Sequence, residues 1–158
     1  MFYSTCVLHS KFAPFTNDLF KDLCSSIDFV SFSGRRNLII FYLIRFCGFR
    51  VSHLLYFNLS NWLELVNNGS TCIKYAVKNK TLIVKFEISE CDRLFLKSLS
   101  WAFEFFSQFP DVCLLRSEKG VPLHVKYAIR YLNSILKIFG SKYGVFLSTE
   151  SLRKCYEN

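Results

Sequence analysis

The sequence of 158 residues predicts an α+β fold, mainly α, with one small antiparallel β-hairpin. Three observations lead to this class. Apolar residues recur at helical spacing before and after the middle of the chain, which indicates amphipathic and buried helices. Residues 71–88 instead alternate and are rich in β-branched side chains, as strands are. Hydrophobic residues make up 51% of the chain, which is enough for one core in a chain of single-domain length.

The N-terminal part predicts a short linker followed by a helix. Residues 1–15 lack a regular pattern and contain Pro14, so we expect an irregular segment there and a folded domain over 16–158. Thr16 and Asn17 are residue types that cap helix starts, which places the first helix directly after them.

The most apolar segment predicts a central helix over 35–47, because hydrophobic residues cover most of its surface. Gly48 is expected to end this helix, and a further helix over 51–59 and a turn at 60–62 to follow. The run 37–49 is shorter than the ~20 apolar residues that cross a bilayer. We therefore expect a buried core helix and no membrane partner.

A change of pattern at residue 71 predicts the hairpin. Residues 72–77 and 81–88 alternate as strands do, and the segment Lys78-Asn79-Lys80 forms the expected tip between them. One long helix over 89–106 is expected next, and Pro110 stops it.

The last third of the chain predicts a short strand and turn followed by two helices. The strand and turn are expected at 114–120, and an amphipathic helix over 125–139 is capped by Gly140. The final helix opens at 148–150.

The charge balance favours a polyanionic partner. The chain has 20 Lys and Arg residues against 12 Asp and Glu, a formal net charge of +8. Such a chain attracts nucleic acid and should bind it in a salt-dependent way. Nucleic acid is therefore an expected class of partner. The alternative from charge alone is a soluble protein with a solvated basic face.

The cysteine pattern speaks against a metal site. Seven cysteines are scattered singly, with no Cys-x-x-Cys pair, so zinc-finger spacing is absent and no metal or cofactor is expected. An odd number without close pairs indicates reduced thiols in an intracellular compartment, mostly buried. The many Phe, Lys, Asn and Ile residues suggest an AT-rich genome, which favours a plastid, another organelle or a bacterial cytoplasm.

The candidate chemistry starts at Arg50, which follows the central apolar helix and its terminal glycine. An arginine held between packed elements can point its charged fork at a fixed target, usually a phosphate or carboxylate. Arg153 has a comparable setting near the other end of the chain. Together with the lysines of the hairpin tip, the two arginines suggest a phosphodiester as ligand or substrate.

Three segments in this order resemble the catalytic domain of tyrosine recombinases, the phage-integrase and Xer-type family. Residues 35–55 resemble the family's charged start, apolar helix and Thr-Gly-Leu-Arg-Ile-Ser-Glu-Leu motif, with His53 in place of the glutamate. The matching residues are Gly48, Arg50, Ser52 and Leu54. Residues 115–123 are similar to the family's strand and turn before its penultimate helix, and 151–154 to the core of its His-x-Leu-Arg-His box.

The resemblance implies DNA strand cleavage and rejoining, as in a site-specific recombinase or integrase. A tyrosine attacks the phosphorus to form a 3′-phosphotyrosine, and two arginines neutralise the developing charge without a metal. Arg50 resembles the first arginine and Arg153 the second. The resemblance makes Lys78 the first choice for the general acid at the hairpin tip, with Lys80 as the alternative.

Departures from the family pattern imply a partial and inactive catalytic domain over 16–158. Glu150 stands where the family usually has a histidine, and its carboxylate would repel a phosphate. Lys154 replaces the histidine after the second arginine and could still donate. Tyr156 lies only three residues past Arg153, about one helical turn, so we do not expect it to be the nucleophile.

Two alternatives remain open beside a partial recombinase: a non-catalytic basic DNA-binding module and an unrelated helical interaction protein. The resemblance also raises a homo-oligomer assembled on DNA. The resemblance implies double-stranded DNA as the partner, and in the recombinase case we expect Arg50 and Arg153 to face one cleft together with the hairpin tip. The further residues expected to contact DNA are Arg35, Arg36, Lys80, Lys119, Lys126 and Lys154.

Overall fold

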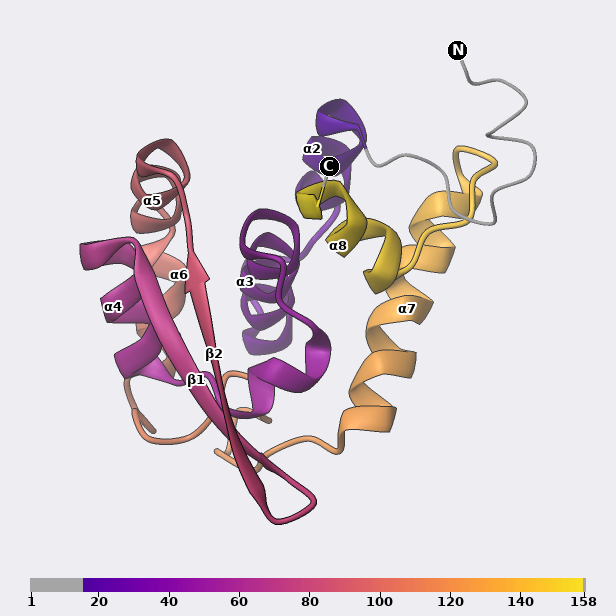
Figure 1. Cartoon of the computed structure of the whole chain (residues 1–158). Coiled ribbons are helices and arrows are strands. Elements are labelled where there is room, and N and C mark those ends of the chain that lie inside the picture. Colours follow the sequence, from indigo (N-terminus) through magenta and orange to yellow (C-terminus); the bar gives the residue numbers. More distant parts are fainter. Residues whose placement is uncertain (1–15, 158) are drawn as a thin grey trace.

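The computed structural model describes residues 16–157, and its elements confirm a mainly helical α+β fold (Figure 1). In chain order they are α2 (Asn17–Ser25), α3 (Phe32–Cys47), the 3-10 helix η1 (Val51–Leu55), α4 (Leu59–Asn68), β1 (Ser70–Val77), β2 (Lys80–Glu87), α5 (Glu90–Lys97), α6 (Ser100–Phe103), the 3-10 helix η2 (Glu104–Phe106), α7 (Val125–Ser141) and α8 (Thr149–Glu157).

Helix α3 lies at the centre of the fold. Figure 1 shows α4, α5, α6 and the hairpin on one side of it and α7 and α8 on the other. Its buried residues occupy nearly every helical position from Leu38 to Ile44, as the sequence predicted. Ser31 caps its start, and Gly48 ends it in a left-handed conformation with φ of 75°. Among the described residues, no helix is long and apolar enough to cross a membrane.

The segment after α3 differs from the sequence prediction. The expected helix over 51–59 is only the single turn η1, and the expected turn at 60–62 lies inside α4. The reason is a reciprocal cap: the Asn61 N–H donates to Asn58 Oδ1 at 3.2 Å, and the Asn58 N–H donates to Asn61 Oδ1 at 2.9 Å. Asn61, predicted in a turn, thus lies in the first turn of α4, and Asn58, predicted inside a helix, caps its start.

The hairpin agrees with the prediction except at its tip. Strands β1 and β2 pair antiparallel from Ser70↔Glu87 to Val77↔Lys80. Lys80 therefore belongs to β2, and the turn consists of Lys78 and Asn79, with φ of 49° and 67°. Positive φ at both central residues is the geometry of a type I′ turn, which fits the twist of a hairpin.

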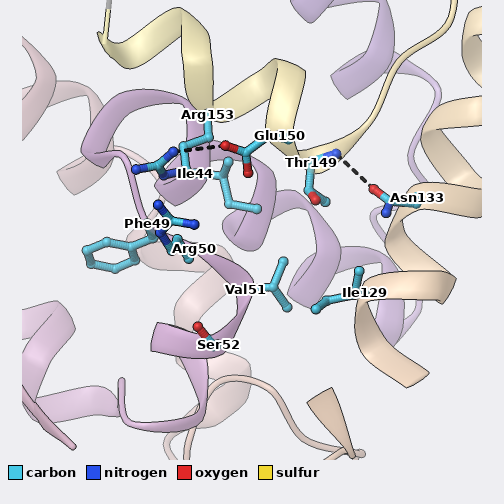
Figure 2. Close-up of a pocket in the computed structure, with 10 residues that line it drawn as sticks. All are labelled: Ile44, Phe49, Arg50, Val51, Ser52, Ile129, Asn133, Thr149, Glu150 and Arg153. Carbon is cyan, nitrogen blue, oxygen red and sulfur yellow. Dashed lines mark hydrogen bonds and ion pairs between the residues drawn. The ribbon is translucent and has the colours of Figure 1, made fainter. Parts of the chain in front are cut away.

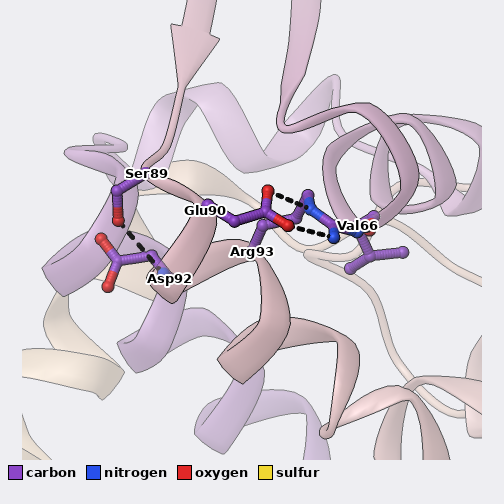
Figure 3. A network of polar contacts seen from close by, with 5 residues as sticks. All are labelled: Val66, Ser89, Glu90, Asp92 and Arg93. Carbon is purple, nitrogen blue, oxygen red and sulfur yellow. Dashed lines mark hydrogen bonds and ion pairs between the residues drawn. The ribbon is translucent and has the colours of Figure 1, made fainter.

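The predicted long helix over 89–106 is divided into α5, α6 and η2. The Ser98 hydroxyl donates to the Phe95 carbonyl at 2.5 Å, at the point where α5 ends. Such side-chain bonds compete with helical ones. Figure 3 shows the start of α5, where Arg93 is held by Glu90 and donates to the Val66 carbonyl of α4 at 2.7 Å. This arginine fixes α5 against α4.

The predictions for α7 and for the strand before it are only partly confirmed. The helix forms as expected but runs past Gly140, which therefore does not cap it. A Cβ on Gly140 would lie 2.6 Å from the Val145 carbonyl oxygen, so the glycine permits a close approach of the chain that returns toward α8. The strand predicted at 114–120 is reduced to one bridge between Arg116 and Pro122.

The described cysteines are mostly core side chains. Cys24, Cys47 and Cys113 are buried, and Cys72 and Cys91 are exposed; all five are free thiols. Burial raises the pKa of the Cys24 thiol to about 11 and also raises the pKa of Cys47. Thiols of this kind are protonated and unreactive at neutral pH.

A basic pocket between α3, α7 and α8 as candidate functional site

A pocket of about 310 Å³ lies where the end of α3, the turn η1, α7 and the start of α8 meet (Figure 2). It is lined by Ile44, Phe49, Arg50, Val51, Ser52, Ile129, Asn133, Thr149, Glu150 and Arg153. We call it the arginine pocket. It brings Arg50 and Arg153 into one cavity, as expected from the sequence.

Arg50 is positioned by its buried neighbours. Phe49 is fully buried against the rings of Phe57 and Phe86, and Val51 is also buried. The Arg50 backbone N–H donates to His53 Nδ1 at 3.0 Å. The backbone is thereby fixed on both sides, while the Arg50 side chain is exposed and faces the pocket (Figure 2).

Arg153 is positioned by the start of α8. The Thr149 N–H donates to Asn133 Oδ1 of α7 at 2.8 Å. Buried Ser148 and Ser151 exchange backbone-to-hydroxyl bonds of 2.7 and 3.2 Å, a reciprocal cap at this helix start. These bonds tie the first turn of α8 to α7 and hold Arg153 at the pocket wall.

Glu150 forms an ion pair with Arg153 inside the arginine pocket. Glu150 Oε1 lies 2.9 Å from Arg153 Nη1, and the side chains are 44% and 17% exposed. An anion entering the pocket therefore meets two guanidinium groups and one carboxylate. The carboxylate competes for Arg153 and lowers the attraction for a phosphate.

In the sequence motif His53 only replaces a glutamate, and the structure gives it a role. Its ring accepts the Arg50 N–H and contacts the rings of Phe86 at 5.2 Å and Tyr75 at 5.8 Å, centroid to centroid. His53 therefore connects the turn that carries Arg50 to the hairpin. Burial, followed by the nearby charges of Arg50 and Arg153, lowers the pKa of His53.

This lowered pKa predicts a loss of stability in mild acid. Above the unfolded-state pKa of about 6.5, His53 is neutral in both the folded and the unfolded state, and its protonation does not lower the free energy of unfolding. As pH falls below that value, the unfolded chain takes up a proton before the folded one, so the free energy of unfolding decreases. Urea unfolding at pH 7.5 and 5.5 measures this decrease.

The variant His53→Gln serves as the comparison, since an amide oxygen can still accept the Arg50 N–H without titrating. We expect a smaller decrease in this variant than in the wild type. His124→Gln, which removes an exposed histidine at the start of α7, should keep the wild-type decrease. Equal decreases in the wild type and His53→Gln would contradict the assignment.

The two hairpin lysines, Lys78 and Lys80, lie outside the arginine pocket. Both are exposed, and the hairpin projects beyond the helices (Figure 1). Lys119, Lys126 and Lys154 are also exposed. Their roles in DNA contact, including that of Lys78 as general acid, stay predictions.

The two arginines at the start of α3 make contacts within the fold, and the predicted DNA contact of Arg35 stays a prediction. Arg35 is partly buried; its Nε donates to the Phe29 carbonyl at 2.6 Å, and its guanidinium lies over the Trp101 ring. Arg36 is only 6% exposed and donates to the Arg116 carbonyl at 2.9 Å and to Asn37 Oδ1. In this arrangement Arg36 joins α3 to the 114–120 segment, and its guanidinium is not available to DNA.

The side chain of Tyr156 lies outside the described residues. That its spacing from Arg153 excludes it as a nucleophile stays a prediction from the sequence. Among the described residues, no group of three or more His, Cys, Asp or Glu side chains could hold a metal ion.

The fold resembles that of known recombinases, although the sequence does not match. No family model matches the chain, and no curated protein matches it significantly. The structure is similar to the crystal structure of XerA recombinase, with a TM-score of 0.61 and 18% identity over 93% of this chain and 49% of that one.

A second similar structure is XerH site-specific recombinase bound to its difH substrate in a pre-cleavage complex. Its TM-score is 0.63 at 17% identity, over 93% of this chain and 41% of that one. The chain thus has a tyrosine recombinase-like fold and spans half or less of the length of these two proteins.

Proposed function

We propose that this chain binds the phosphodiester backbone of duplex DNA in the arginine pocket and that these 158 residues do not cleave it. The observation that carries the proposal is the convergence of Arg50 and Arg153, far apart in sequence, on one cavity of a recombinase-like fold. A net charge of +8 supports a polyanionic ligand. The XerH structure is itself a complex with its difH substrate.

The geometry of the pocket suits a phosphate. Arginine guanidinium groups bind phosphate oxygens through paired, charge-assisted hydrogen bonds, and their planar fork keeps its charge at every relevant pH. Ser52 and Thr149 add hydroxyl groups to the lining. A backbone phosphate held here would bridge the turn after α3 and the start of α8, which the fold brings together.

The residues around Arg153 do not favour cleavage. Cleavage of the recombinase type needs a tyrosine oriented for in-line attack. Tyr156 is the only tyrosine after Arg153 in these residues, and a spacing of three places it about one helical turn along α8. Glu150 also replaces a donor by a carboxylate that engages Arg153. A DNA-binding module that retains the fold is therefore the form of the function we favour over an active recombinase.

Two assays test the proposal. A gel shift with duplex DNA over a series of salt concentrations should show affinity that falls steeply with salt. A nicked suicide substrate, which traps covalent protein–DNA adducts, should yield none. A covalent adduct that disappears in Tyr156→Phe would contradict the second half of the proposal, and salt-independent binding would contradict the first.

The hairpin tip offers a prediction in which stability and binding change in opposite directions. Lys78 has φ of 49°, which costs a residue with a Cβ about 1 kcal/mol and which asparagine tolerates better. Lys78→Asn should therefore raise the free energy of unfolding by about 0.5–1 kcal/mol. If Lys78 contacts a phosphate, the same change lowers the salt slope of DNA binding by about 0.9.

Lys80→Asn is the matched control, because Lys80 loses the same charge from a strand position without positive φ. It should give no gain in stability. An unchanged salt slope in Lys78→Asn would remove Lys78 from the DNA-contacting residues.

A further inference from the structure

A second pocket is lined by α7 and the segment before α8 and shares a lining residue with the arginine pocket. Its volume is about 370 Å³. Helix α7 contributes Arg130, Asn133, Ser134 and Lys137, and the segment before α8 contributes Phe146, Leu147 and Ser148. We call it the α7 pocket.

The two pockets share Asn133. The Asn133 side chain accepts the Thr149 N–H, so a hydrogen bond between α7 and α8 joins a residue that lines both pockets to one that lines the arginine pocket. Ser148, which lines the α7 pocket, and Thr149, which lines the arginine pocket, are adjacent in sequence. The two cavities are therefore contiguous along the same helix junction.

The α7 pocket is basic and holds no carboxylate in its lining. Arg130, Ser134 and Lys137 are spaced by four and three residues, which places them on one face of α7. All three are exposed. Within the part of the chain that the structure describes, neither Arg130 nor Lys137 forms an ion pair. Both charges are thus available to an external anion.

We infer that the α7 pocket is a second phosphate subsite, which receives a phosphate of the same DNA strand near the one in the arginine pocket. This inference rests on the proposed function. Phosphates recur along each strand at a rise of about 3.4 Å, so two contiguous basic cavities suit one continuous backbone. Contacts of this kind fix the register and orientation of a duplex without reading its sequence. Arg130 supplies a planar guanidinium group and Lys137 a compact ammonium group for the phosphate oxygens.

The test compares the salt dependence of duplex DNA binding in three proteins. These are the wild type, the double variant Arg130→Gln/Lys137→Gln and the control Lys21→Gln/Lys97→Gln, which removes the same charge from exposed positions on α2 and α5. The slope of log affinity against log salt should fall in magnitude by about 1.8 in the first double variant, at about 0.9 per phosphate contact. The control should keep the wild-type slope.

The outcomes separate this inference from the proposed function. Suppose that the wild type binds DNA and that this binding depends on Arg50. If Arg130→Gln/Lys137→Gln then keeps the wild-type slope of log affinity against log salt, only the second subsite is overturned. A wild type without salt-dependent DNA binding would overturn both. Each single variant should show about half of the decrease in slope that the double variant shows. The single variants therefore test the subsite even if the double variant fails to fold. Tighter binding of polyglutamate than of DNA at equal charge, lost in the double variant, would assign the α7 pocket to an acidic peptide instead.

Discussion

Replacing Arg50 by glutamine is expected to weaken duplex DNA binding by about 10- to 100-fold at moderate salt. A hydrogen-bonded charge contact of this kind contributes about 1.5–3 kcal/mol. The loss should be close to the full value, because Arg50 is exposed to the pocket and its backbone is already fixed by Phe49 and by His53. Fluorescence anisotropy with a labelled duplex measures the affinity.

Lys97→Gln is the control for Arg50→Gln, since it also removes one positive charge, from an exposed position in the last turn of α5. It should change the affinity by less than about threefold, because a distant exposed charge is screened by salt. Equal losses in both variants would show that net charge, and not the arginine pocket, governs binding.

Replacing Glu150 by glutamine is expected to strengthen DNA binding by about tenfold. The Glu150 carboxylate accepts from Arg153 at 2.9 Å, and its removal ends the competition of this carboxylate with the phosphate for Arg153. The gain is limited to about 1–1.5 kcal/mol because the pair is partly exposed and solvent screens it. Glutamine keeps the size of the side chain, so the pocket should keep its shape.

The matched control for this change is Glu104→Gln, which removes an exposed carboxylate outside the arginine pocket. It raises the net charge by the same amount and should alter the affinity little. An affinity of Glu150→Gln equal to or below that of the wild type would mean that Glu150 does not compete with the ligand for Arg153.

Much of the fold could be predicted from the sequence because its strongest patterns are local. The apolar run of α3 and its terminal Gly48 predicted a buried helix and its end within one residue. The alternation in 72–77 and 81–88 predicted the hairpin. These features follow from periodicity and from glycine at positive φ, which need no knowledge of distant contacts.

The errors arose where a residue serves a tertiary or reciprocal contact. Asn61 lies in a predicted turn and Asn58 in a predicted helix, yet the two cap each other at the start of α4. The sequence predicts a helix end at Gly140, whereas this glycine makes room for the returning chain at Val145. Arg36 is a basic residue of the kind that contacts DNA, yet it is buried and donates to the Arg116 carbonyl. No local pattern distinguishes these cases.

The candidate site could be predicted in part. Arg50 and Arg153 were identified from their position after helix signals and from the resemblance, and the fold places both in one pocket. The role of His53 could not be predicted, because it depends on rings from the hairpin, Tyr75 and Phe86. The α7 pocket was also missed: Arg130 and Lys137 look like ordinary solvated residues of a helix until the segment before α8 lies beside them.

The most direct test of the central claim is the crystal structure of this chain with a short DNA duplex. We expect a backbone phosphate within about 2.7–2.9 Å hydrogen-bond distance of the guanidinium groups of both Arg50 and Arg153. We also expect Glu150 to have turned away from Arg153. A duplex bound on another surface, with the Glu150–Arg153 pair intact and no phosphate in the arginine pocket, would contradict this claim.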